Sequence, residues 1–200
     1  MPQGERVAVA RGSAHAPGLG ADAGLSASRR RERGARQMHG VPSLAGAGRQ
    51  PSLAEAEACI ERGDGLEEAG DLGGAALEFT RATQLDPSDT EAWSSLGNVL
   101  RGLARPAEAA VAYESAAASD PTDPDLLLYR AAALSRCGDL EGAAGCIDAA
   151  LELMLAAEER DASAVADGWV SRGVAAFGLG RTAEAMAYYD RALAEVAGHE

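Results

Sequence analysis

The 200-residue sequence predicts an all-α protein, an α-solenoid of about four stacked helix–turn–helix hairpins. A fixed period carries this prediction, because Gly63 and Gly97 are 34 residues apart and Phe79 and Tyr113 are separated by the same interval. Composition agrees, since only 4% of the residues are aromatic and alanine and glutamate, which favour helices, are abundant. A repeat of this length, built from one helical hairpin each time, is typical of arrays that bury a continuous core by stacking.

Residues 1–51 are expected to form a disordered tail. They hold eight arginines and three acids, a net charge of about +5, and little apolar surface whose burial could offset the chain entropy lost on ordering. Two interpretations of the basic run at residues 29–36 stay open: a solvated tail that folds back weakly on the acidic body, which we favour, or an arm that contacts nucleic acid. Met38 is an alternative start of translation.

The first hairpin is expected to begin near Ser52, which forms a capping box with the glutamate three residues later. A first helix then covers about 53–69 and a second about 72–84, with Asp71 as the cap of the second. Pro87 ends the hairpin, because the residue before a proline avoids helical backbone angles.

The second hairpin begins at Ser88, which also has a glutamate three residues later. Its first helix runs to about residue 103. Pro106 suits the first turn of the next helix, which continues to about residue 118 and stops before Pro121.

The third hairpin opens at Thr122 or Asp123 and turns at residues 138–139. Trp93 and Trp169 are 76 residues apart, which is eight more than two periods of 34. We therefore expect a lengthened second helix, with a solvated end at residues 158–161. A last hairpin covers about 163–179 and 182–197. The predicted domain, residues 52–200, thus has repeats at about 56–89, 90–123, 124–165 and 166–199.

Small residues and rings recur at matched positions of these repeats. Glycine in a helix costs ~1 kcal/mol relative to alanine, so its recurrence indicates that two helices approach closely there. The signature consists of Gly63, Ala75, Phe79, Ala82 and Pro87, then Trp93, Leu96, Gly97, Ala109, Tyr113, Ala116 and Pro121, and finally Trp169, Gly173, Ala185, Tyr189 and Ala192. This pattern, with W-x2-L-G at its start, resembles the tetratricopeptide repeat family.

The resemblance implies a right-handed superhelix whose inner wall is formed mainly by the first helix of each repeat. At the positions typical of that wall, acids crowd the first repeat, polar groups fill the middle and apolar groups occupy the end. The predicted peptide-binding residues are Glu57, Glu61, Asp64, Glu68, Ser95, Asn98, Arg101, Leu128, Tyr129, Val170, Val174 and Phe177. The alternative is that the acids form a solvated face and the apolar groups pack locally.

A carboxylate clamp, known in part of this family, is not expected. The clamp needs cationic and amide side chains that donate hydrogen bonds to a C-terminal carboxylate. The corresponding positions here hold Ile60, Asp64, Ser95, Asp125 and Tyr129.

The charge of the predicted domain limits its partners. Residues 52–200 carry ten arginines and twenty-eight acids, a net charge of about −18, which repels nucleic acid and anionic membranes. The expected partners are proteins or peptides with basic and apolar segments. Met186, Tyr188 and Leu193 are expected to lie bare at the end of the array, which suggests a homodimer through the last repeat.

No catalytic motif, metal-ligand spacing or cofactor loop is present, so neither an enzyme nor a cofactor is expected. Cys59, Cys137 and Cys146 are interpreted as small apolar residues of a cytoplasmic protein; a redox pair of the last two is a distant alternative. The predicted function is a protein–protein adaptor or scaffold. The alternatives are a regulatory or sensor module that controls a partner enzyme or a secretion or assembly machine and, more distantly, nucleic-acid contact through the tail.

Overall fold

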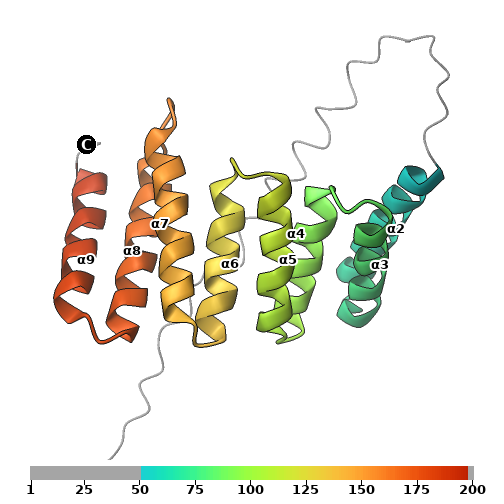
Figure 1. Ribbon diagram of the computed structural model, residues 1–200, viewed down its shortest axis with the longest axis horizontal. Helices are drawn as coiled ribbons and strands as arrows, with labels where there is room; N and C mark the ends of the chain where they lie inside the picture. Colours follow the sequence, from blue (N-terminus) through green and yellow to red (C-terminus); the bar gives the residue numbers. More distant parts are fainter. Residues whose placement is uncertain (1–50, 198–200) are drawn as a thin grey trace, which may run out of the picture. The chain divides into compact units, whose positions relative to one another are not determined.

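The computed structural model describes residues 51–197, with side chains from residue 53, and this part of the chain forms eight α-helices and no strand. The helices stand side by side in chain order (Figure 1). The predicted all-α array of hairpins is therefore confirmed. The expectations for residues 1–50, including the basic run and Met38, lie outside the described residues. The hairpins are α2 (Pro51–Glu68) with α3 (Leu72–Leu85), α4 (Thr90–Gly102) with α5 (Pro106–Ser119), α6 (Pro124–Arg136) with α7 (Leu140–Ala156), and α8 (Ala162–Gly178) with α9 (Thr182–Ala197).

Aspartate caps start most of these helices. The carboxylate of Asp71 accepts a hydrogen bond from the backbone N–H of Gly74 at 2.9 Å, as predicted. Asp123, one of the two predicted caps, accepts from the N–H of Asp125 at 2.8 Å. Such a side chain satisfies a backbone donor that the first helical turn leaves without a partner.

The predicted cap at Ser88 is wrong. The cap of α4 is Asp89, whose carboxylate accepts from the N–H of Ala92 at 3.0 Å. The Ser88 hydroxyl instead donates to Asp86 at 2.7 Å, within the turn that Pro87 forces at the end of α3. The same turn recurs one repeat later, where the hydroxyl of Thr122 donates to Asp120.

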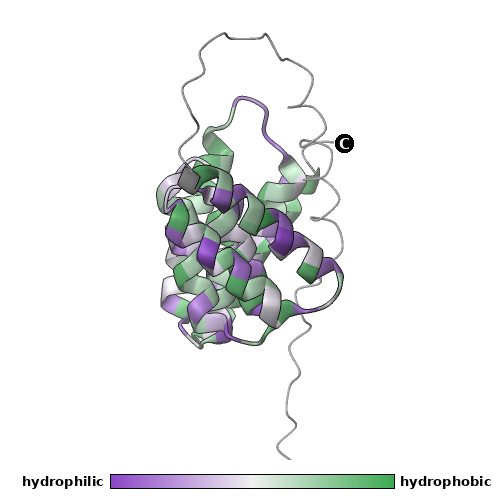
Figure 2. Cartoon of the chain, turned by 90° about the vertical axis from the view of Figure 1, so that its right-hand side faces the viewer, coloured by the Kyte–Doolittle hydropathy of each residue, from purple (hydrophilic) through white to green (hydrophobic). Residues whose placement is uncertain are grey.

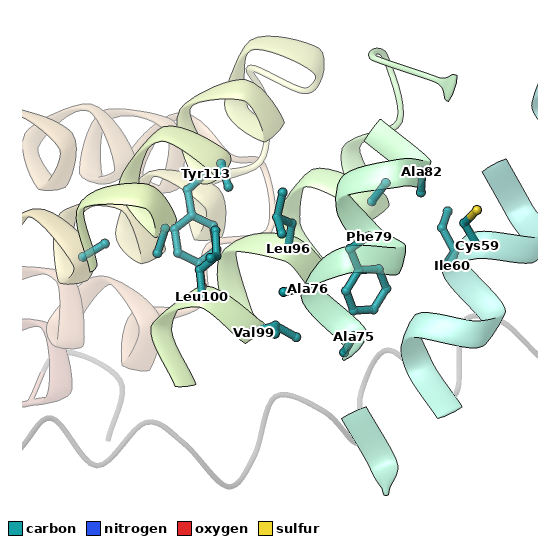
Figure 3. Close-up of a cluster of buried hydrophobic side chains, with 14 of the residues drawn as sticks. Cys59, Ile60, Ala75, Ala76, Phe79, Ala82, Leu96, Val99, Leu100 and Tyr113 are labelled. Atoms are coloured by element: carbon teal, nitrogen blue, oxygen red, sulfur yellow. The ribbon is translucent and has the colours of Figure 1, made fainter. Parts of the chain in front are cut away.

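The two helices of a hairpin pack closely at the repeated glycines. The ring that faces each glycine leaves no room for a methyl group (Figure 3 shows the rings of repeats one and two). In repeat three, Ala131 and Ile147 replace the glycine and the ring, and both are buried. A β-carbon built on the glycine would lie 2.7 Å from the ring at Gly63 and Phe79, 2.6 Å at Gly97 and Tyr113, and 2.5 Å at Gly173 and Tyr189.

Alanines and the first tryptophan complete the repeated packing. The indole N–H of Trp93 donates to the carbonyl of Pro87 at 2.9 Å, which ties α4 to the preceding turn. The signature alanines of the second helices are all buried: Ala75, Ala82, Ala109, Ala116, Ala185 and Ala192. The small residues therefore serve close helix packing, as the sequence predicts.

Successive repeats stack through the first helix of one repeat and the second helix of the repeat before it. A β-carbon built on Gly168 of α8 would lie 2.7 Å from a methyl carbon of Leu151 in α7. One at Gly178 would lie 2.7 Å from Leu140, near the other end of the same two helices. One side of α7 is therefore packed against α8 along the length of both helices. The equivalent helices α3 and α4 make the same kind of contact between Leu72 and Gly102.

The extra residues of repeat three lie where the spacing of the tryptophans indicates. α7 has 17 residues, against 14 in α3 and in α5. The turn after it, residues 157–161, is exposed. Arg160 in this turn pairs with Glu195 of α9 at 3.0 Å. Within residues 51–197, no helix has both the length and the apolar character needed to cross a membrane.

Candidate functional site

The candidate site is the face formed by the first helices of the repeats, α2, α4, α6 and α8. Positions are counted from the repeat starts Ala56, Thr90, Pro124 and Ala166. We call the side chains at positions 2, 5, 6, 9, 12 and 13 the A-helix face. Stacking of similar hairpins places each position on the same side of every first helix, so the chemistry of this face can be followed from α2 to α8.

Position 2 carries an acid in every repeat. All four of these side chains are exposed: Glu57, Glu91, Asp125 and Asp167. Glu91 and Asp125 stand in the first turn of their helices, where a carboxylate also interacts favourably with the helix dipole. The result is a line of negative charge that runs along the array.

Further acids make α2 the most negative part of the A-helix face. Glu61 and Glu68 are exposed and Asp64 is partly buried. Partial desolvation raises the pKa of Glu67, although its side chain reaches solvent, and the nearby carboxylate of Asp64 raises it further. A raised carboxyl pKa means that the folded state resists this charge, and a cation brought next to it would relieve that cost.

In the middle of the face, several side chains that the sequence predicts to be available for binding make contacts within the protein instead. Ser95 is only 8% exposed, so little of it is available to a partner. The side-chain oxygen of Asn98 accepts a hydrogen bond from the Tyr113 hydroxyl at 2.8 Å. Tyr129 is partly buried, and its ring centroid lies 5.5 Å from that of Tyr113. Arg101 and Leu128 are also partly buried.

The far end of the face is apolar and exposed. Val174 is 45% exposed and Phe177 is 64% exposed. Val170, at position 5, is exposed as well, although the position-5 residues of the first two repeats, Ile60 and Ser94, are buried. The two ends of the face thus differ in polarity, and the residues in its middle are largely occupied by contacts within the protein.

A second feature, which the sequence analysis missed, is a shallow hollow of ≈ 340 Å³ between α2 and α3. Cys59 lies at position 4, where repeats two and four have Trp93 and Trp169, so the bulk of an indole is missing there. Arg62 beside it pairs with Glu78 at 2.8 Å. Figure 2 views this end of the molecule and shows hydrophilic residues interspersed along the nearest helices. The hollow is lined by Glu55, Ala58, Cys59, Arg62, Glu78 and Arg81.

Two ion pairs between repeats were also missed. Arg130 pairs with Glu114 of the preceding repeat at 2.9 Å, and Arg172 pairs with Asp148 at 2.7 Å. Burial alone would lower the pKa of Arg172, but its hydrogen bond to Asp148 raises that pKa above the ordinary value, so the guanidinium stays charged. A signal was present in the sequence, because both pairs join position 25 of one repeat to position 7 of the next.

The cysteines are free thiols: Cys59 is buried, Cys146 is partly buried and Cys137 is exposed. Burial raises the pKa of the Cys146 thiol, which reduces its reactivity. In the described part of the chain, no group of three or more His, Cys, Asp or Glu side chains is placed to hold a metal ion.

A model of the tetratricopeptide repeat matches residues 60–124, 96–151 and 136–200, which together span more than half of the chain. The chain belongs to the tetratricopeptide repeat family. No curated protein matches the sequence of this tetratricopeptide repeat protein.

Several solved structures share its fold at low sequence identity. MamA from Desulfovibrio magneticus RS-1 (residues 41 to the end) is 19% identical with a TM-score of 0.61, and the match covers 72% of this chain and 77% of MamA. BtubC from P. vanneervenii is 14% identical with a TM-score of 0.65, covering 77% and 68% of the two chains. The type III secretion translocator chaperone SycD of Yersinia enterocolitica is 19% identical with a TM-score of 0.54, covering 60% and 83%.

Proposed function

We propose that this tetratricopeptide repeat protein is a binding scaffold whose A-helix face takes a polypeptide segment that is basic at one end and apolar at the other. The observation that carries the proposal is the gradient of the face. An exposed acid stands at position 2 of every first helix, and α2 adds Glu61 and Glu68, whereas α8 offers Val174 and Phe177.

The two ends would contribute differently to binding. An exposed ion pair is worth only ~0–1 kcal/mol, so the acids would act mainly together, by attracting and orienting a basic segment. Burial of apolar surface contributes roughly 25 cal/mol per Å², and aromatic side chains often anchor an interface. Phe177, with 64% of its surface exposed, is the strongest candidate anchor.

The proposed role is non-catalytic. Membership of the family supports a protein-interaction scaffold, and the exposed carboxylates that dominate the face attract cationic segments. Residues 51–197 also contain no histidine, the usual general base at neutral pH. A cytoplasmic location remains a prediction from the sequence.

Peptide titration tests the proposal. The full chain would be titrated into fluorescein-labelled peptides with an arginine-rich half and a leucine- and phenylalanine-rich half, in both chain orders, and anisotropy would be measured. We expect Glu61→Arg and Glu68→Arg each to weaken binding about three- to tenfold, because each replaces attraction by repulsion. Glu158→Arg is the matched control, since it makes the same charge change in the exposed turn between α7 and α8. Equal affinities in all four proteins would refute the proposal.

A further inference from the structure

The outer face of the last repeat exposes large apolar side chains at positions that repeat three buries. We define the end face as Val170 of α8 with Met186, Asp190, Leu193 and Val196 of α9. α9 is the last helix of the described chain and has only α8 beside it (Figure 1). We propose that an amphipathic helix of a partner protein covers the end face, in the place that the first helix of a fifth repeat would take.

The exposed fractions of side chains at equivalent positions show which residues of the last repeat lack a covering helix. Leu151, at position 28 of repeat three, is 2% exposed, whereas Leu193 at position 28 of repeat four is 69% exposed. Position 21 behaves in the same way, because its three earlier alanines are buried and Met186 is 63% exposed. Val196 is 54% exposed, while its equivalent Met154 is buried. Within residues 51–197, the end face is thus a stacking surface that no other helix covers.

The shape of the missing helix follows from repeat three. Leu151 is covered by Gly168 of α8, where a β-carbon would lie only 2.7 Å from the leucine side chain. Leu193 occupies the position equivalent to Leu151. A helix that covers it in the same way therefore needs a glycine or another very small residue at the crossing point.

The charge of the missing helix follows from the ion pairs between repeats. Position 25 holds Glu114 and Asp148 in repeats two and three, and each pairs with an arginine at position 7 of the next repeat. Position 25 of repeat four is Asp190, which is exposed and makes no ion pair within residues 51–197. Gly168 and Arg172 are four residues apart, so the partner helix should carry a small residue followed four residues later by an arginine.

The opposite end of the array supports this asymmetry. There, Arg62 and Glu78 pair with each other and leave a polar outer surface. Terminal repeats of soluble arrays normally carry such a polar face. Within residues 51–197, the α2–α3 end therefore offers a polar surface, whereas the end face is apolar.

A second copy of the chain fits this face less well than a separate helix. Two end faces packed against each other would place both Asp190 carboxylates at the edge of one apolar interface. Neither copy would supply an arginine from its end face, and an unpaired acid in such a place is costly. The homodimer predicted from the sequence is thus an outcome that the test must distinguish.

The probe is a peptide with the sequence of residues 162–178, which is α8, the natural cover of repeat three. Its binding to the full chain would be followed by anisotropy. We expect saturable binding that weakens at least about tenfold for the Asp190→Arg protein. The same peptide with Arg172→Glu should bind the Asp190→Arg protein better than the unchanged peptide does, and a Gly168→Leu peptide should bind at least about tenfold more weakly.

Controls separate this surface from the A-helix face and from misfolding. Glu61→Arg should leave binding of the α8 peptide unchanged, so failure of either proposal can be recognised by itself. Circular dichroism of Asp190→Arg should match that of the unchanged protein, because the side chain is exposed. Absence of saturable binding, equal affinity in the Asp190→Arg protein, or a dimer in light scattering that Leu193→Glu dissociates would overturn the proposal.

Discussion

Replacing two helical glycines by alanine should change stability in opposite directions. Gly145, in α7, is exposed, and a β-carbon there would meet nothing within 4 Å. Gly145→Ala should therefore raise the free energy of unfolding by up to ~1 kcal/mol, the difference in helix propensity. At Gly97 the new β-carbon would lie 2.6 Å from the ring of Tyr113, which is fully buried and cannot swing away.

The contact between Gly97 and the Tyr113 ring sets the expected difference in unfolding free energy between the two variants. Both substitutions gain the same propensity term, but Gly97→Ala also overpacks the hairpin, which costs ~1–3 kcal/mol. Urea unfolding followed by circular dichroism would measure both midpoints, with unchanged m values as the check that only stability has moved. We expect Gly97→Ala to lie ~1–3 kcal/mol below Gly145→Ala. Equal shifts in the two variants would show that the close contact of helix and ring is not a determinant of the fold.

A double variant sharpens the test. Repeat three combines Ala131 with Ile147 at the same two positions, and both are buried. Gly97→Ala together with Tyr113→Ile reproduces this pair in repeat two. Tyr113→Ile should recover part of the loss caused by Gly97→Ala, and a double-mutant cycle would measure the coupling.

Three further predictions concern single contacts. Trp93→Phe removes the donor to the Pro87 carbonyl and should lower the free energy of unfolding by ~1 kcal/mol in urea titrations. Asp148→Asn leaves the buried Arg172 without its carboxylate and should lower the free energy of unfolding by ~1–3 kcal/mol in the same assay. About half of the Asp148 side chain is exposed, so solvent screening reduces this loss. Partial burial raises the pKa of Glu67 in the folded state, so its ionised form opposes folding. Glu67→Gln should therefore raise the urea midpoint at pH 7, and the gain should shrink as the pH falls towards 4.5, the ordinary value of the group.

The sequence predicts the elements well because their ends are chemically marked. Pro106 begins α5, Asp71 caps α3, and the interval between Trp93 and Trp169 locates the extra residues of repeat three. The misplaced cap at Ser88 has a local cause. Ser88 fits the sequence pattern of a capping box, but its hydroxyl donates a hydrogen bond to Asp86 in the preceding turn. Asp89 therefore caps the helix.

The candidate site is less predictable, because exposure depends on the neighbouring repeat. Ser95 and Val170 belong to equivalent first helices and were both expected on the binding surface. The structure buries Ser95 and leaves Val170 38% exposed. Such a difference depends on what stacks on each hairpin and on where the array ends, and the residue type and its spacing do not contain that information. The Arg172–Asp148 pair could have been found by comparing equivalent positions across two repeats instead of within one.

The neighbour-only arrangement of the helices has a mechanical consequence. Because α2 to α9 pack in chain order, no long-range tie fastens one end of the array to the other. A force applied between residues 53 and 197 would load the hairpins in series, and the weakest would open while its neighbours stayed folded. Such a molecule would behave as an extensible spring between whatever its two ends hold.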